Sequence, residues 1–123
     1  MDLEKRLELA RLYDFYGPLL TQRQQEVFDL YYFQDYSLAE IAQVAGITRQ
    51  AVHDLLQRSS RQLEQFEMRL GLVRRFHKQE SDLRAFVDDL LEIKNEMEAR
   101  ADCRQLAHRL GAMIESLESI GEM

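Results

Sequence analysis

The stretch from Ser37 to Arg61, which reads SLAEIAQVAGITRQAVHDLLQRSSR, most constrains what this chain can fold into. Ser37 and Glu40 have the spacing of a capping box, in which each side chain satisfies a backbone N–H group at a helix start. Gly46 can adopt the left-handed conformation that ends a short helix, and Thr48 can cap the helix that follows. Two helices joined by a tight glycine turn, the second longer than the first, are predicted to form a helix-turn-helix.

The second predicted helix, from Arg49 to about Leu70, has one apolar face and one polar face. Its apolar residues repeat every three to four positions, which is typical of a helix packed on one side. The polar face begins near the helix N-terminus, the end that reads base edges in helix-turn-helix proteins. The candidate nucleic-acid-binding residues are Thr48, Arg49, Gln50, His53, Gln57, Arg58 and Arg61. A solvated face without a binding role would show the same pattern, so base reading stays open.

Charge is distributed unevenly along the 123 residues, whose formal net charge is −6. Residues 58–78 carry six basic and two acidic side chains, whereas residues 79–123 carry five basic and eleven acidic ones. Because affinity for nucleic acid comes largely from neutralising phosphates, an acidic protein needs such a local basic segment. The segment adds an auxiliary basic patch that consists of Arg69, Arg74, Arg75 and Lys78. The alternative is a solvated helix end and loop, and the acidic tail could compete with phosphates for the patch.

The flanking segments also read as helices, so the expected fold class is all-α. Residues 2–16 form a helix that Gly17-Pro18 stops, and Thr21 opens the next helix with a second capping box. Gln79-Glu80-Ser81 is predicted to be a loop before a long C-terminal helix, which Gly111 kinks or divides. The predicted domains are a helix-turn-helix domain over residues 1–72 and a helical extension over residues 73–123. The long apolar stripe of the extension must be covered, either by the core or, as we favour, by a second copy in a homodimer.

No catalytic or metal-binding pattern accompanies these helices. The histidines are His53, His77 and His108. No cysteine or carboxylate lies at a spacing that would make a metal site with His53, and Cys103 is the only cysteine of the chain. The sequence contains no glycine-rich phosphate loop and no nucleophile motif. We therefore expect a protein that is not an enzyme and that uses no cofactor or metal. No apolar run is long enough for a membrane span and the first residues lack the core of a signal peptide, so we expect a cytoplasmic protein without membrane contact.

Two family resemblances follow from these residues. Leu20 to Glu67 resembles the region-4 helix-turn-helix of bacterial sigma factors, a broad winged-helix-like superfamily, although the chain is too short for a true sigma factor. A closer resemblance, to the small YlxM-like proteins of bacteria, covers most of the chain up to about Phe76. It is carried by the segments Tyr16-Gly17-Pro18-Leu19-Leu20-Thr21, Tyr31-Tyr32, Ser37-Leu38-Ala39-Glu40-Ile41-Ala42 and Thr48-Arg49-Gln50-Ala51-Val52-His53-Asp54. This resemblance implies an all-helical protein with a regulatory or accessory role in the signal recognition particle pathway.

Two functions therefore remain open. The first is a DNA-binding regulator that inserts the second helix of the helix-turn-helix into duplex DNA. The second is an accessory module that keeps the same scaffold but binds the GTPase or the RNA of the signal recognition particle. A shared fold is compatible with both functions.

Overall fold

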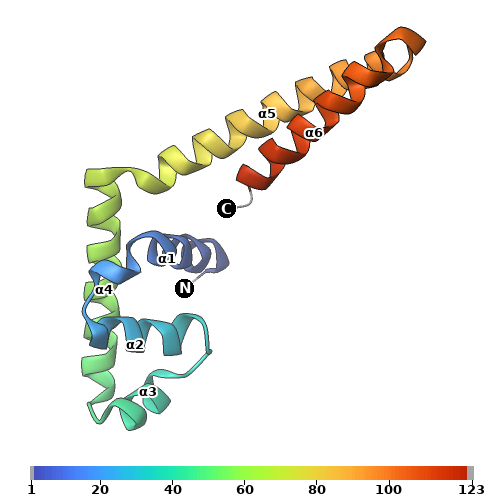
Figure 1. Cartoon of the computed structure of the whole chain (residues 1–123). Coiled ribbons are helices and arrows are strands. Elements are labelled where there is room, and N and C mark those ends of the chain that lie inside the picture. Colours follow the sequence, from blue (N-terminus) through green and yellow to red (C-terminus); the bar gives the residue numbers. More distant parts are fainter. Residues whose placement is uncertain (1, 122–123) are drawn as a thin grey trace. The chain divides into compact units, whose positions relative to one another are not determined.

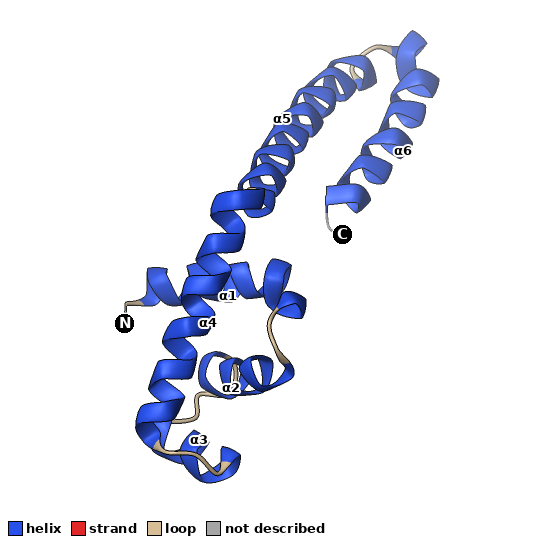
Figure 2. Cartoon of the chain, turned by 90° about the vertical axis from the view of Figure 1, so that its left-hand side faces the viewer, coloured by secondary structure: helices blue, strands red, loops and turns tan. Residues whose placement is uncertain are grey.

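The computed structural model describes residues 2–121, which contain α-helices and short 3-10 turns but no strand (Figure 2). The chain divides into two compact units between Val73 and Arg74. The first unit holds the helices α1 (Leu3–Tyr16), α2 (Gln22–Tyr32), α3 (Leu38–Ala45) and α4 (Arg49–Leu70). Most of α5 (Leu72–Glu98) and all of α6 (Arg104–Gly121) belong to the second. The all-α fold is confirmed, and residues 2–121 lack the β-wing that a winged-helix domain would add.

Local capping signals set the helix boundaries of the first unit. The predicted capping boxes are both present, because the side chains of Thr21 and Ser37 each accept a bond from the backbone of the third helical residue. Gly46 ends α3 in the left-handed region, with φ of 69°. The hydroxyl of Thr48 accepts a bond from the N–H of Ala51 and begins α4. Gly71 ends α4 with φ of 63°, as the sequence predicted.

The helix α4 is the element on which the first unit is built, since α1, α2 and α3 all pack against it (Figure 1). Its buried face combines with the inward faces of the other three helices in one hydrophobic core. The most deeply buried large side chains of this core are Tyr16, Phe28, Leu9, Ile41, Leu63, Val27 and Val52. Burial of these side chains supplies the main driving force for folding. The opposite face of α4 takes no part in this core.

Polar contacts hold the start of α5 against the core. The hydroxyl of Tyr16 donates to Oε1 of Glu67 over 2.6 Å and accepts from the N–H of Leu72 over 3.1 Å. The same oxygen of Glu67 accepts from the N–H of Val73 over 3.1 Å. These N–H groups begin a helix and have no partner within it. Gly71 has no side chain that could cap them, so Tyr16 and Glu67 act as the cap.

The C-terminal part of the chain differs from the sequence prediction in two places. The loop predicted at Gln79-Glu80-Ser81 is wrong, because α5 continues through these residues without interruption. None of the three is glycine or proline, and Phe76, Leu83 and Val87 keep the helical spacing of apolar residues across them. A serine can cap a helix, but it also fits inside one when the flanking turns are already helical.

The predicted long C-terminal helix is in fact two helices. The chain turns back at residues 99–103, through the 3-10 turn Ala101–Cys103, so that α5 and α6 run antiparallel side by side (Figures 1 and 2). Gly111 neither kinks nor divides a helix, because it lies within α6. A Cβ atom at Gly111 would lie 3.2 Å from the flexible end of the Lys94 side chain, so α5 and α6 are close enough here for Lys94 to contact α6. Part of the apolar stripe is therefore covered within the hairpin itself.

Candidate nucleic-acid interface

The N-terminal half of α4 is held in place by contacts from α2 and α3. Nη2 of Arg23 on α2 donates to the carbonyl oxygen of Ala45, the last residue of α3, over 3.0 Å. The N–H of Ile47 donates to the carbonyl oxygen of Ala42 over 3.1 Å and closes the turn between the two helices. Together with the Thr48 cap, these bonds fix the direction in which α4 starts. Sequence reasoning missed the role of Arg23, because its partner is a backbone carbonyl far along the chain.

The structure brings most of the predicted binding residues onto one face of α4. Val52, Leu56 and Leu63 are buried and define the inward side of the helix. The outward side carries exposed side chains over about three turns, which corresponds to roughly 18 Å along the helix axis. These exposed residues are Arg49, Gln50, His53, Gln57, Arg58 and Arg61. Thr48 is also exposed, but its hydroxyl oxygen already accepts the capping bond. Its hydroxyl group is therefore mainly available as a hydrogen-bond donor to a ligand.

Asp54 lies in the middle of this face and organises its neighbours. Nε2 of Gln50 donates to Oδ1 of Asp54 over 3.0 Å, and Nδ1 of His53 lies 3.7 Å from the same oxygen. The carbonyl oxygen of the Gln50 amide remains available as an acceptor. Asp54 was not among the predicted binding residues, although a carboxylate can accept a bond from the amino group of cytosine. The same carboxylate repels phosphate groups that come close to it.

The cationic part of the face lies further along α4. Arg58 and Arg61 follow Asp54 by one and two turns, and both are exposed. Nη2 of Arg61 donates to Oε1 of Gln57 over 3.4 Å, which leaves its other N–H groups available to a ligand. Near the helix N-terminus the face thus carries both hydrogen-bond donors and acceptors. One to two turns after Asp54 it carries the positive charges of Arg58 and Arg61. This order suits contact with base edges at one end and with phosphates at the other.

The auxiliary basic patch is divided between the two units. Arg69 lies in the last turn of α4 and is exposed. Arg74, Arg75 and Lys78 are also exposed, but they lie on α5 in the second unit. The six cations from residues 58–78 therefore do not form one row on a single helix. Arg58, Arg61 and Arg69 are the cations that the first unit contributes.

Residues 2–121 contain neither a metal-binding cluster nor a membrane-spanning helix. No three side chains of histidine, cysteine, aspartate or glutamate within residues 2–121 are grouped as a metal ion would require. In the same part of the chain, every helix is too short or too polar to span a bilayer. Cys103 is half-buried in the hairpin turn, and His77 and His108 lie on α5 and α6 in the second unit.

Comparison with known proteins decides the family. A family model described as "Putative helix-turn-helix protein, YlxM / p13 like" (UPF0122) matches residues 3–104. The chain belongs to this family. A UPF0122 protein of Symbiobacterium thermophilum is 48% identical over 99 residues, which cover 80% of this chain and 89% of that protein. A UPF0122 protein of Halalkalibacterium halodurans is 35% identical over 118 residues, which cover 96% of this chain and 98% of the relative.

The family match confirms the YlxM-like resemblance and extends it beyond the helix-turn-helix. The matched residues include α1 to α5 and the hairpin turn, and the alignment with the Halalkalibacterium protein spans nearly the whole of both chains. The sequence similarity therefore extends into the segment that forms the C-terminal helices. The sequence prediction had placed the end of the resemblance near Phe76, which was too early.

Proposed function

We propose that this YlxM-like protein is a DNA-binding regulator that inserts the N-terminal half of α4 into the major groove of duplex DNA. The observation that supports it is the exposed polar face of α4, which the core does not use and which two neighbouring helices hold in place. In this arrangement Arg49, Gln50 and His53 contact bases, whereas Arg58 and Arg61 contact phosphates. Thr48 and Gln57 lie beside them and complete the interface.

The test is a fluorescence-anisotropy titration of the protein with two duplexes at several salt concentrations. One duplex comes from the region upstream of the protein's own operon, and the other has the same composition in scrambled order. We expect the first to bind at least about tenfold more tightly, since a single bidentate base contact contributes about 1–3 kcal/mol of discrimination. Equal binding of both duplexes would refute base reading by α4.

A triple variant and a matched control locate the contact on the protein. Arg49→Ala/Arg58→Ala/Arg61→Ala removes three cations from the face of α4. We expect it to lose the preference for the first duplex and to lower the slope of log affinity against log salt by about two, because two phosphate contacts disappear. The control, Arg84→Ala/Arg100→Ala/Arg104→Ala, removes three exposed cations from α5, α6 and their connection. An equal loss in both variants would show that only net charge matters.

A second candidate function is supported by the carboxylate in the middle of the same face and by the acidity of the whole chain. Asp54 sits among the proposed base-contacting residues, and the whole chain has a net charge of −6. Both features weaken attraction to phosphates and suit a protein partner better. Through the family resemblance, that partner is the GTPase of the signal recognition particle, alone or assembled with its RNA. Equally weak binding of both duplexes, together with tight binding of the particle, would support this accessory role.

The variant Asp54→Asn separates the two functions. It removes one negative charge and keeps an oxygen that can accept the bond from Gln50. If α4 faces DNA, we expect affinity for both duplexes to increase, because a charge that repels phosphates is lost. If α4 faces a protein through its carboxylate, the variant should leave duplex binding weak and reduce affinity for the particle. The same anisotropy assay measures both results.

A further inference from the structure

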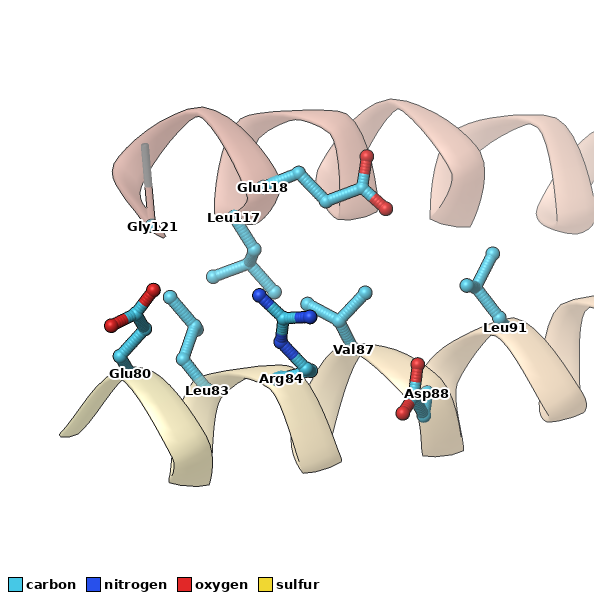
Figure 3. A pocket seen from close by; sticks show the side chains of 9 residues that line it. All are labelled: Glu80, Leu83, Arg84, Val87, Asp88, Leu91, Leu117, Glu118 and Gly121. Atoms are coloured by element: carbon cyan, nitrogen blue, oxygen red, sulfur yellow. The ribbon is translucent and has the colours of Figure 1, made fainter. Parts of the chain in front are cut away.

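The helices α5 and α6 touch through one side each. Val87 on α5 and Ala107 and Ile114 on α6 are buried in the hairpin. At Gly121 a Cβ atom would lie 3.3 Å from Cδ2 of Leu83, so the two helices approach closely at that end as well. Figure 3 shows Leu83, Val87 and Leu117 between the helices, with charged side chains around them. Val87 and Lys94 define the inward side of α5, and Ala107, Ile114 and Gly121 define that of α6.

A second set of apolar residues remains exposed on the same helices. Its members are between 49% and 63% exposed, although they are large aliphatic or aromatic side chains. Each one directly precedes a residue of the inward side. The five exposed residues are Phe86, Ile93, Leu106, Met113 and Ile120, which precede Val87, Lys94, Ala107, Ile114 and Gly121.

This regular offset places the exposed residues of α5 and those of α6 on the same side of the hairpin. One residue of an α-helix corresponds to a rotation of about 100°. Each exposed side chain is therefore turned by about a quarter of a circle from the inward side, always in the same sense along its chain. Antiparallel helices are related by a local two-fold axis perpendicular to the plane that contains them. An equal rotation consequently brings the exposed residues of α5 and α6 to one side.

Half-buried residues join the exposed ones into a continuous surface. Leu90 and Met97 fill the spaces on α5, while Leu110 and Leu117 fill them on α6. The resulting spacing alternates between three and four residues on both helices, which is the pattern of a helix that packs against other helices. We call this surface the hairpin face. It consists of Phe86, Leu90, Ile93, Met97, Leu106, Leu110, Met113, Leu117 and Ile120, all of them uncharged.

We propose that the hairpin face binds the hairpin face of a second copy of this chain, so that four helices form a bundle. A surface made of two parallel stripes fits a partner with two helices better than a single helix. A second copy presents such a surface, and face-to-face packing about a two-fold axis closes after two chains. This inference does not depend on what α4 binds.

The area of the hairpin face is sufficient for such a dimer. An aromatic side chain such as that of Phe86 exposes roughly 150–250 Å² when free and an aliphatic one somewhat less, so a half-exposed side chain of this set has on the order of 100 Å² to bury. Five such side chains offer about 500 Å² on each copy, and the pair would bury about 1,000 Å² before any flanking residues are counted. That is the lower limit for a specific protein interface. Monomeric proteins rarely expose contiguous apolar patches larger than a few hundred Å², and patches of that size are often functional.

Charges at the edge of the face favour one arrangement of the two copies. Asp82, Asp89 and Glu96 follow one another at seven-residue spacing along the edge of α5, whereas the edge of α6 carries Arg109. Packing α5 on α5 would bring the acidic rows together, which is unfavourable. Packing α5 on α6 of the other copy avoids this. Lys94 of α5 lies beside Gly111 of α6, and this contact shows how the two antiparallel helices are aligned along their axes. With the same alignment between the two copies, Glu96 of one copy lies beside Arg109 of the other.

Sedimentation equilibrium over about 1–100 µM chain tests the proposal, a range that would reveal a micromolar or tighter dimer. We expect the wild-type protein to have twice the chain mass of 14.6 kDa. Ile93→Glu/Met113→Glu places two charges in the hairpin face and should give the mass of one chain. The control Asn95→Glu/Ala112→Glu changes exposed residues that follow the inward side instead of preceding it, and it should stay dimeric. Circular dichroism at 222 nm verifies that both variants remain helical.

Each alternative result contradicts a defined part of the proposal. A wild-type protein that is monomeric at all these concentrations refutes self-association and leaves the face to another partner. A dimer that survives Ile93→Glu/Met113→Glu in a folded protein shows that a different surface is used. For the arrangement, Glu96→Arg and Arg109→Glu should each weaken the dimer about twofold to tenfold, and their combination should restore it. Absence of that restoration refutes the packing of α5 on α6.

Discussion

The substitution Tyr16→Phe tests whether the cap at the start of α5 stabilises the protein. It removes one hydroxyl group and keeps the aromatic ring, which is buried against Phe66 at a centroid distance of 5.9 Å. Two hydrogen bonds disappear with the hydroxyl: the one donated to Glu67 and the one accepted from the N–H of Leu72. The change creates no large cavity, so the loss of stability reports on hydrogen bonding.

The magnitude follows from the kinds of bond involved. A hydrogen bond to a charged group contributes about 1.5–3 kcal/mol, and one between neutral groups contributes about 1 kcal/mol. The carboxylate of Glu67 keeps its bond from the N–H of Val73, so it is not left without a partner. We therefore expect Tyr16→Phe to lower the free energy of unfolding by about 2–4 kcal/mol. With a typical denaturant slope, this shifts the midpoint of urea unfolding down by about 1–2 M.

Tyr13→Phe is the matched control for this experiment. Its hydroxyl lies 3.4 Å from the carbonyl oxygen of Gln25, which is long for a hydrogen bond, and its ring stacks on Phe28 with or without the hydroxyl. We expect it to cost less than about 1 kcal/mol. Urea unfolding followed by circular dichroism measures both variants. If the two substitutions cost the same, or if Tyr16→Phe costs less than about 0.5 kcal/mol, the capping role assigned to Tyr16 is wrong.

Three further predictions concern alkaline pH and the two glycines Gly46 and Gly111. Burial raises the pKa of the Tyr13, Tyr16 and Tyr32 hydroxyls above their usual value, and the bond to Glu67 adds to the effect at Tyr16. The stabilisation that depends on the protonated hydroxyls is complete below about pH 10 and is lost as pH rises through the higher pKa values of the folded state. Urea unfolding from about pH 9 to pH 11.5 should therefore show a decreasing free energy of unfolding. The decrease should be less steep in Tyr16→Phe. Gly46→Ala should cost about 1 kcal/mol in thermal unfolding, since the left-handed backbone disfavours a side chain although the space is open. Gly111→Ala should instead stabilise by up to about 1 kcal/mol, because only the flexible end of Lys94 must move, and a loss would mean that the hairpin requires the glycine.

The features that could be predicted from the sequence are those decided by neighbouring residues. A capping box needs only two side chains three positions apart, so Ser37 with Glu40 fixed the start of α3 without reference to the rest of the chain. The end of α3 at Gly46 follows from the backbone preference of one residue. The amphipathic pattern of α4 then determined which side would be buried. The prediction of the helix-turn-helix was confirmed because its information is short-range.

The turn between α5 and α6 depends on long-range contacts and was missed for that reason. Residues 99–103 contain neither glycine nor proline, so no local signal interrupts the helical pattern there. The chain turns because α6 gains apolar contacts by folding back on α5, as the burial of Val87 and Ile114 shows. Gly111 did give a signal, but its meaning was close approach of two helices and not a helix end. Similarly, nothing local in the sequence could reveal the hydrogen bonds that Tyr16 makes to Glu67 and Leu72.

The two proposed interaction surfaces share one property, which is that folding a single chain does not use them. Replacing the exposed residues on α4 should leave the free energy of unfolding nearly unchanged, because no core residue depends on them. The hairpin face differs from the face of α4, because exposing its apolar area to water is unfavourable. Covering that area with another surface stabilises the protein. A dimer should therefore become more stable to unfolding as chain concentration rises, whereas duplex DNA should stabilise the protein in proportion to its own concentration. Measuring thermal unfolding against both concentrations thus separates the contribution of the hairpin face from that of α4.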